Sequence, residues 1–241
     1  MIKKIMKLFL IKPKNITKRY LSLILQMVLI VPSLSSVAIA GEEECGTLTT
    51  HFGPWDFYDQ KNHRSTGAEA QGKIKIVTGR HLTKNMLRLK RGSTAVDIKQ
   101  DLDYTLRAIP NHPKALDLAS RFAYQRSISE SFKNRQKKLT LTAECYFDRA
   151  FRLKRDRAEV WVIYGIHNHR FKNYKKAISN YITANELGLN SPEINYYMGL
   201  SYFAVADYEN AKKQATIAYD GGFPLQGLKN KLKSVDQWTA N

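Results

Sequence analysis

One pattern of small and aromatic residues occurs twice between residues 158 and 225, with a separation of 34 residues. Four of its six positions carry the same residue type in both copies, and two positions differ. The six pairs are Trp161/Asn195, Gly165/Gly199, Tyr174/Tyr208, Ala177/Ala211, Tyr181/Ala215 and Ala184/Ala218. A fixed period of this length is typical of stacked copies of one supersecondary unit, each of which buries its apolar face against its neighbours.

The spacing within each copy predicts two helices that pack closely. A glycine inside a helix costs about 1 kcal/mol relative to alanine, so Gly165 and Gly199 indicate positions where another helix approaches too closely for a side chain. The two alanines that follow in each copy are seven residues apart and share one helix face. The expected turns and helix ends then fall at Asn173-Tyr174, Asp207-Tyr208, Gly188, and Gly221-Gly222 before Pro224.

The period, together with the glycine, tyrosine and alanine positions, resembles the tetratricopeptide repeat, a helix–turn–helix unit. The resemblance covers roughly residues 95–225 and is clearest in residues 158–191 and 192–225. It implies an all-α fold, in which residues 93–241 form a tetratricopeptide-like solenoid of helical hairpins with about three units. Two unrelated amphipathic helix pairs are the alternative.

An earlier unit departs from this spacing. Residues 98–109 follow helical periodicity up to Pro110, and a first helix is expected over 113–124. In the second helix, Ala143, Phe147 and Ala150 match the later copies, but they come 11 residues late when counted from Pro113. Residues 125–138 must therefore contain an insertion, either as longer helices or as a projecting basic loop.

Residues 41–92 show no repeat, and we expect them to pack as an irregular segment on the N-terminal end of the array, because terminal repeats need a cover. Ile74–Val77 predicts a short strand, and residues 83–91 predict a short helix with Thr83 as N-cap. A capping helix is expected after Pro224, with Trp238 closing the end. Its apolar positions are Leu225, Leu228, Leu232 and Val235.

Residues 1–40 have the order of a secretory signal peptide. A basic start without acidic residues precedes an apolar stretch from Leu21 to Val31, and Ala38-Ile39-Ala40 follows as a cleavage site. The apolar stretch is shorter than the roughly 20 residues that a membrane-spanning helix needs. We therefore expect cleavage after Ala40, a periplasmic location and no transmembrane helix in the remaining chain; an uncleaved anchor is the alternative.

Charge and cysteine content narrow the classes of partner. Seven of the 39 lysines and arginines lie in the signal segment, so 32 basic residues face 21 acidic ones and the remaining chain carries a net charge of +11. Such a balance favours polyanions as partners, although export argues against nucleic acid.

Two cysteines in an exported chain predict a disulfide between Cys45 and Cys145. A free reactive pair is the alternative, but the chain has no C-x-x-C spacing to support it.

In the tetratricopeptide family the first helix of each unit lines a concave groove that holds a peptide or an extended protein segment. The resemblance implies a groove that is basic at one end and apolar-aromatic at the other, suited to a segment with an acidic group and hydrophobic anchors. The implied lining residues are Lys114, Asp117, Arg121, Tyr124, Val162, Ile166, His169, Arg170, Tyr196, Leu200 and Phe203. The apolar members among them are also compatible with a place in the core.

A basic run offers a second candidate surface, for docking to anionic lipid or glycan. It contains Arg149, Arg152, Lys154, Arg155 and Arg157. Arg149 and Arg152 share one helix face near its C-terminus, where the helix dipole favours cations. A solvated helix end without a partner is the alternative.

No catalytic or metal-binding motif occurs in the sequence. His167 and His169 are two residues apart and point in different directions on a helix. We therefore expect no enzyme, no cofactor and no metal. The expected function is that of a non-catalytic scaffold or adaptor of the cell envelope that binds a protein or peptide segment. A basic protein that docks on lipopolysaccharide, acidic glycan or exopolysaccharide is the alternative, and an enzyme is a more distant one.

Overall fold

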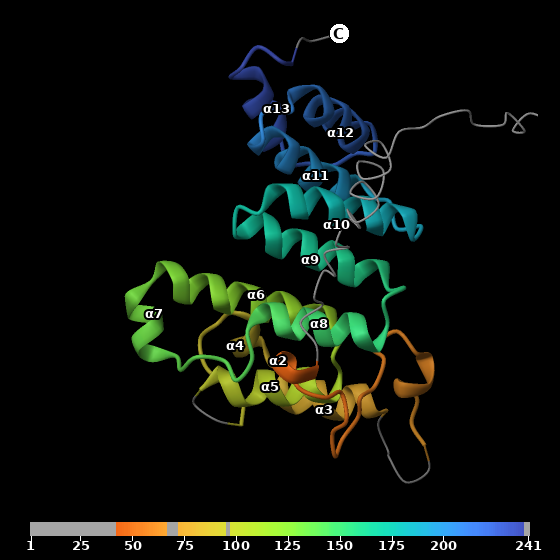
Figure 1. Ribbon diagram of the computed structural model, residues 1–241, viewed down its shortest axis with the longest axis vertical. Coiled ribbons are helices and arrows are strands. Elements are labelled where there is room, and N and C mark those ends of the chain that lie inside the picture. Colours follow the sequence, from red (N-terminus) through yellow and green to blue (C-terminus); the bar gives the residue numbers. More distant parts are fainter. Residues whose placement is uncertain (1–41, 67–71, 95–96, 239–241) are drawn as a thin grey trace, which may run out of the picture. The chain divides into compact units, whose positions relative to one another are not determined.

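The computed structural model describes residues 42–66, 72–94 and 97–238 of the chain (Figure 1). The predicted signal segment, residues 1–40, lies outside these ranges. Helices make up the regular structure of the described residues, which contain no strand, and the expectation of an all-α fold is confirmed. The helices are α2 (Glu42–Cys45), α3 (Lys73–His81), α4 (Lys84–Leu87), α5 (Ile98–Ala108), α6 (Pro113–Ile128), α7 (Glu130–Arg135), α8 (Ala143–Leu153), α9 (Ala158–Arg170), α10 (Tyr174–Glu186), α11 (Pro192–Ala204), α12 (Tyr208–Asp220) and α13 (Gly227–Lys233), with a 3-10 turn, η1, at Gln60–Asn62.

Helices α9 to α12 repeat with the period of the sequence. The first and last residues of α11 each follow those of α9 by 34 positions, and the same holds for α12 and α10. α9 packs on α10, α10 on α11, and α11 on α12. The second copy therefore has the same helix limits as the first, and consecutive helices pack against each other along the chain.

The two helical glycines mark close approaches. A Cβ atom added to Gly165 would lie 2.5 Å from the ring of Tyr181, and one added to Gly199 would lie 2.5 Å from Leu228. The counterpart of Tyr181 in the second copy is Ala215, whose short side chain leaves room for Leu228 of α13. The pair Tyr181/Ala215 therefore differs because different helices fill the space beside the glycine. Tyr181 of α10 fills it in the first copy, and Leu228 of α13 fills it in the second.

Equivalent aromatic contacts close the two turns. The ring of Tyr174 packs on His169 with a centroid separation of 5.1 Å, and the ring of Tyr208 packs on Phe203 at 5.3 Å. Both helix pairs then end at a glycine in the left-handed region, Gly188 with a φ of 88° and Gly222 with a φ of 82°. These are the ends that the sequence predicts, since glycine adopts this conformation without steric cost.

The insertion in the earlier unit combines both forms that the sequence left open. α6 continues to Ile128, beyond the expected end at residue 124, and the short helix α7 follows it (Figure 1). α7 packs back on α6 through Phe132, whose ring meets Phe122 edge to face at 5.2 Å. The extra residues are thus attached to the main apolar core, while the cationic side chains of α7 and the segment after it are exposed.

The predicted strand at Ile74–Val77 is wrong, because these residues belong to α3. Ile74 and Val77 are buried against α5, whereas Ile76 is 40% exposed. Burial three residues apart is the spacing of a helix face, and four residues are too few to separate this pattern from strand alternation. The predicted helix at 83–91 forms only over Lys84–Leu87 and is followed by Leu89 in the left-handed region.

A buried carboxylate connects the N-terminal segment to α5. Asp101 accepts hydrogen bonds from the backbone N–H groups of Ser93 and Thr94, at 2.6 Å and 3.0 Å, and from the Thr94 hydroxyl at 2.5 Å. His81 of α3 lies 2.8 Å from the same carboxylate. Burial alone would raise the pKa of Asp101, but these hydrogen bonds outweigh it and the pKa is lowered.

The two cysteines lie at disulfide-bonding distance, with 2.04 Å between the Sγ atoms of Cys45 and Cys145. The pair joins α2 to α8, two elements that are 100 residues apart in the chain. The predicted pairing is therefore present in the structure.

The expected C-terminal helix is also present, as α13, which packs on α11 and α12. Leu228 and Leu232 are fully buried there, and the ring of Trp238 meets that of Tyr219 edge to face at 5.7 Å. Leu225 is 54% exposed and precedes the helix, so it does not belong to the buried face. None of the helices in the described ranges has the length and apolar character needed to cross a membrane.

Candidate functional site

Three of the predicted groove residues meet on the face formed by α6 and α9. The carboxylate of Asp117 accepts a hydrogen bond from Arg121 Nε at 2.7 Å and another from Arg170 Nη2 at 3.2 Å. Asp117 and Arg121 are one helical turn apart on α6, whereas Arg170 is the last residue of α9. One carboxylate is therefore held between two guanidinium groups from successive helices, and the cluster keeps a net positive charge.

Tyr124 and Tyr197 lie near this cluster. Tyr124 of α6 packs edge to face on Phe171 at the end of α9, with a centroid separation of 5.7 Å. Burial raises the pKa of the Tyr197 phenol, and the charges of Glu193, Arg170 and Asp117 act on the same group. Tyr197 is partly buried, so part of the residue remains exposed to solvent.

A polar chain with two buried members, Ser120 and His167, continues from the cluster to an exposed carboxylate, and sequence reasoning missed it. The hydroxyl of Ser120 accepts a hydrogen bond from Arg170 and lies 3.0 Å from His167 Nδ1. His167 Nε2 lies 3.3 Å from a carboxylate oxygen of Glu144 on α8. This hydrogen bond is the main cause that lowers the pKa of Glu144 to about 2. The three residues belong to different helices, so no linear motif connects them.

The order serine, histidine, carboxylate also occurs in hydrolytic enzymes, but the geometry here does not suit that chemistry. Ser120 is fully buried within α6, and its oxygen already accepts a hydrogen bond from Arg170. A nucleophile must reach the carbonyl group of its substrate. The chain of contacts from Ser120 through His167 to Glu144 instead connects α6, α9 and α8.

The predicted apolar-aromatic end of the groove is covered by α13. Tyr196 is only 6% exposed and lies in one cluster with Leu228 and Leu232 of α13, and Leu200 and Phe203 are partly buried against this cluster. The expectation that Tyr196 forms an open anchor is therefore wrong. The sequence predicted a capping helix after Pro224 but could not show which face of α11 this helix would cover.

The middle of the predicted lining is also partly committed to packing. Val162 and Ile166 are partly buried against the cluster that contains Tyr181. His169 Nδ1 lies 2.8 Å from the Ser201 hydroxyl, which connects α9 to α11. Burial lowers the pKa of His169, and the charges of Arg170 and Lys231 lower it further.

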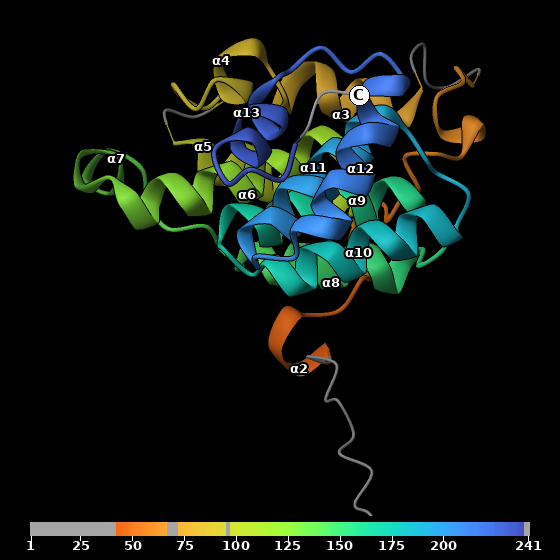
Figure 2. The ribbon, with the colours of Figure 1, turned by 90° about the horizontal axis from the view of Figure 1, so that it is seen from above.

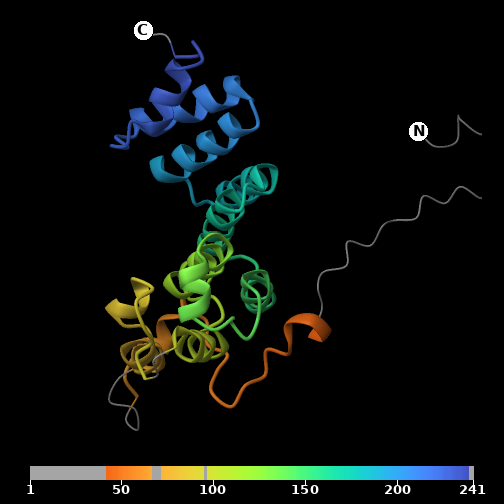
Figure 3. The same ribbon diagram turned by 90° about the vertical axis from the view of Figure 1, so that its left-hand side faces the viewer.

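The N-terminal segment covers the other end of the face. Arg121 Nη1 donates a hydrogen bond to the carbonyl oxygen of Leu87 at 2.9 Å, so the end of α4 lies against α6. Lys114 and Leu87 line one cavity of about 500 Å³ together with His112. Figures 2 and 3 show α4 and α13 on the same side of α6 and α9, opposite α8 and α2. Asp117, Arg170 and Tyr197 belong to α6, α9 and α11, respectively.

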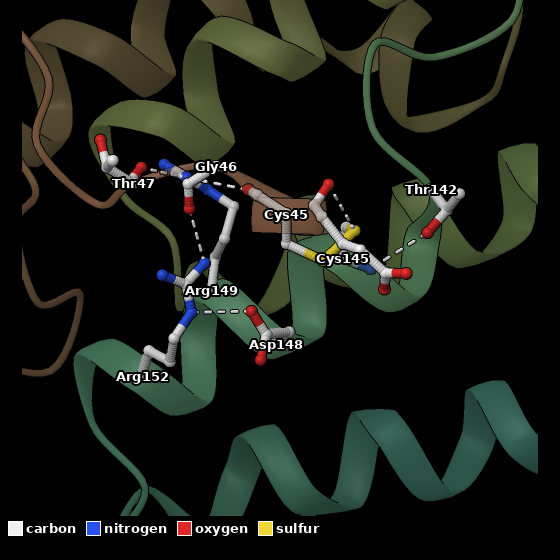
Figure 4. A network of polar contacts seen from close by, with 9 residues as sticks. Cys45, Gly46, Thr47, Thr142, Cys145, Asp148, Arg149 and Arg152 are labelled. Carbon is white, nitrogen blue, oxygen red and sulfur yellow. Dashed lines mark hydrogen bonds and ion pairs between the residues drawn. A yellow bond between two sulfur atoms is a disulfide. The ribbon is translucent and has the colours of Figure 1, made fainter. Parts of the chain in front are cut away.

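The predicted basic docking surface is largely used for internal contacts. Arg149 is 3% exposed, and its guanidinium donates to the carbonyl oxygens of Cys45 and Gly46, each at 3.3 Å, and to that of Thr47 (Figure 4). Arg152 donates to Asp148 at 2.7 Å and to the Gly46 carbonyl at 2.8 Å. The prediction of a docking patch is therefore wrong for both residues.

Of the other three cations in that run, one makes an internal ion pair and two are exposed. Arg157 forms an ion pair of 2.6 Å with Asp56, and its guanidinium lies over the ring of Tyr58. Lys154 and Arg155 are exposed, and Arg155 lies over the ring of Trp161. Sequence spacing placed these cations near one another but could not show that the N-terminal segment supplies carbonyl and carboxylate groups to three of them.

The described residues contain no group of three or more histidine, cysteine, aspartate or glutamate side chains that could hold a metal ion. Comparison of the chain with models of protein families, with curated proteins and with solved structures found no match.

Proposed function

We propose that the chain is an exported, non-catalytic scaffold with a tetratricopeptide-like repeat, and that it binds an extended segment of another protein on the face of α6, α9 and α11. The exact 34-residue offset between the limits of the two helix pairs supports the repeat assignment. The signal-like residues 1–40 and the paired cysteines support export into an oxidising compartment such as the periplasm.

The cluster of Asp117, Arg121 and Arg170 is the observation that carries the proposed binding site. Both guanidinium groups are oriented by the shared carboxylate, and a planar guanidinium is suited to bind a carboxylate through two hydrogen bonds. Tyr197 adds a partly exposed aromatic ring beside it. The site therefore suits a short segment that presents an acidic side chain next to an aromatic or aliphatic one.

The proposed site is shorter than the groove predicted from the sequence. The contact of Arg121 with Leu87 places α4 at one end, and the burial of Tyr196 beside α13 closes the other end. A bound segment would cross the face between these two elements instead of running along all the first helices.

Site-specific photocrosslinking tests the proposal directly. A photoreactive amino acid replaces Tyr197, and in a matched control it replaces Ile217, which is 42% exposed on α12. The full chain is produced and crosslinked in cells that export it. We expect a discrete protein adduct at position 197 and none at position 217. The Arg170→Gln substitution should reduce the yield of the adduct at position 197 about tenfold, the equivalent of about 1.4 kcal/mol in binding free energy.

Arg170 also contacts Ser120, so thermal unfolding of the Arg170→Gln variant has to show that it is folded at the temperature of the experiment. Adducts of equal yield at both positions, or adducts that persist in the folded variant, would show that this face does not bind the partner.

A further inference from the structure

The insertion between α6 and α8 forms a cavity that the repeat does not account for. Its volume is about 400 Å³, which is within the usual range for small-molecule sites. α6, the segment before α8, the first residues of α8, and the residue after α9 contribute to its wall. Its lining includes Ala123, Arg126, Lys138, Leu139, Leu141 and Phe171.

The floor of this cavity is apolar. Phe122 is fully buried and belongs to the main core, and Leu139 is buried in the same cluster. Leu141 is partly buried against that core, and Phe171 closes the side next to α9. Leu141 and Phe171 are the partly exposed members of this apolar wall, and they favour an alkyl chain or an apolar ring because covering them removes apolar surface from water.

The polar residues of the cavity include two cations. Arg126 is held in place by the insertion itself, since its Nη1 donates to the carbonyl oxygens of Gln136 and of Lys133, the latter at 3.0 Å. Lys138 is exposed and lines the cavity with it. The carboxylate of Glu144 is the opposing charge, and it is paired with His167 at 3.3 Å.

The sequence around the cavity adds to this positive charge. The insertion also contains Lys133, Arg135 and Lys137, which are exposed, and Lys133 forms an exposed pair with Glu130 at 3.4 Å. The turn that follows Phe171 adds Lys172. An anionic ligand would therefore approach a surface on which cations outnumber carboxylates, and this favours its association.

From these contacts we propose that the cavity binds a single-chain anionic amphiphile, a molecule with one carboxylate and an alkyl chain. The chain packs on Leu141 and Phe171, above the buried Leu139, and the carboxylate lies at Arg126 and Lys138. This site does not depend on the binding of a peptide at Asp117 and Arg170, and the insertion supplies residues that a regular repeat unit would lack.

Calorimetric titration of the full chain with dodecanoate, below its critical micelle concentration, tests this site. Dodecanol, which lacks the charge, serves as the matched ligand. We expect saturable binding of dodecanoate that is at least about tenfold tighter than binding of dodecanol. Lys138→Glu reverses the charge at an exposed position and is expected to weaken dodecanoate binding about tenfold or more.

Two further variants separate the site from general effects. Lys213→Glu makes the same change at an exposed position of α12 and is expected to leave the affinity unchanged. Ala123→Phe fills part of the cavity and is expected to weaken dodecanoate and dodecanol alike, provided that circular dichroism shows a folded chain.

Three outcomes would overturn the proposal. They are the absence of dodecanoate binding, equal affinity for dodecanoate and dodecanol, and equal effects of Lys138→Glu and Lys213→Glu. If the first outcome is accompanied by binding to anionic phosphatidylglycerol vesicles, the cations recognise a membrane surface and not a single chain.

Discussion

At the scale of single residues, Arg149 differs most from its sequence-based interpretation. Its guanidinium is surrounded by the backbone carbonyl oxygens of Cys45, Gly46 and Thr47, beside the disulfide (Figure 4). The loss of solvation on burial lowers the pKa of Arg149, and the neighbouring charges of Arg152 and Arg107 lower it further. Such a residue holds the N-terminal segment on α8 and is not available to an external polyanion.

Replacement of Arg149 by methionine should therefore reduce stability. The change leaves the three carbonyl oxygens without their charged donor, and a buried hydrogen bond to a charged group contributes about 1.5–3 kcal/mol. We expect the free energy of unfolding, measured by urea titration, to fall by about 2–3 kcal/mol.

The matched control is Lys154→Met, a neighbouring and exposed cation that should change stability by less than about 0.5 kcal/mol. Similar stabilities of the two variants would mean that the contacts of Arg149 with these carbonyl oxygens contribute little to the fold.

At the scale of elements, the repeat predicted the helices where its pattern was complete. The expected turns at Tyr174 and Tyr208 and the expected ends at Gly188 and Gly222 are all observed. These positions depend on local chemistry, since glycine in the left-handed region ends a helix whatever surrounds it. The short run Ile74–Val77 was misassigned, because its helical conformation depends on the contact of α3 with α5.

Gly165 offers a test of the close packing between α9 and α10. In Gly165→Ala the new methyl group would lie 2.5 Å from the fully buried ring of Tyr181, which has little room to move. Overpacking of a core typically costs about 1–3 kcal/mol, and we expect a loss of this size in urea unfolding. The loss should shrink in a Tyr181→Ala background, because the second copy already combines a glycine with Ala215.

Gly79 is the matched control for this substitution. It lies in α3 and has no atom within 4 Å of the position of an added Cβ. Gly79→Ala should therefore stabilise the protein by up to about 1 kcal/mol, the difference in helix propensity. Equal effects of the two alanine substitutions would show that the ring of Tyr181 yields, and that the glycine is not required for packing.

At the scale of the whole molecule, the disulfide is the predicted contact whose two residues are farthest apart in the described chain. It links residues 100 positions apart and joins α2 to α8. In the loop-entropy model, closure of a loop of this length restricts the unfolded chain and stabilises the fold by up to about 4.7 kcal/mol.

Reduction should therefore lower the midpoint of urea unfolding, by an amount that corresponds to a loss of about 2–4 kcal/mol. The control is a Cys45→Ala, Cys145→Ala double variant, whose midpoint should be close to that of the reduced protein and should not respond to reductant. A wild-type midpoint that is the same with and without reductant would show that the link does not stabilise the protein in solution.

The arrangement of the candidate site was only partly predictable. Asp117, Arg121 and Arg170 could be proposed as residues of one surface because the family resemblance assigns them to first helices that line the same groove. The register does not specify what covers these positions. The packing of α4 on Arg121 and of α13 on Tyr196 decided that, and both elements lie outside the repeat.

The sequence by itself determined the helical class, the limits of α9 to α12, the pairing of Cys45 with Cys145 and the existence of an insertion before α8. These features follow from periodicity, from residues that end helices and from the lack of a second cysteine pair. Only the tertiary structure decided that Arg149 is buried, that Ser120, His167 and Glu144 form a chain, and that the insertion encloses a cavity. Each of these depends on contacts between residues far apart in the chain, and local sequence patterns carry no information on such contacts.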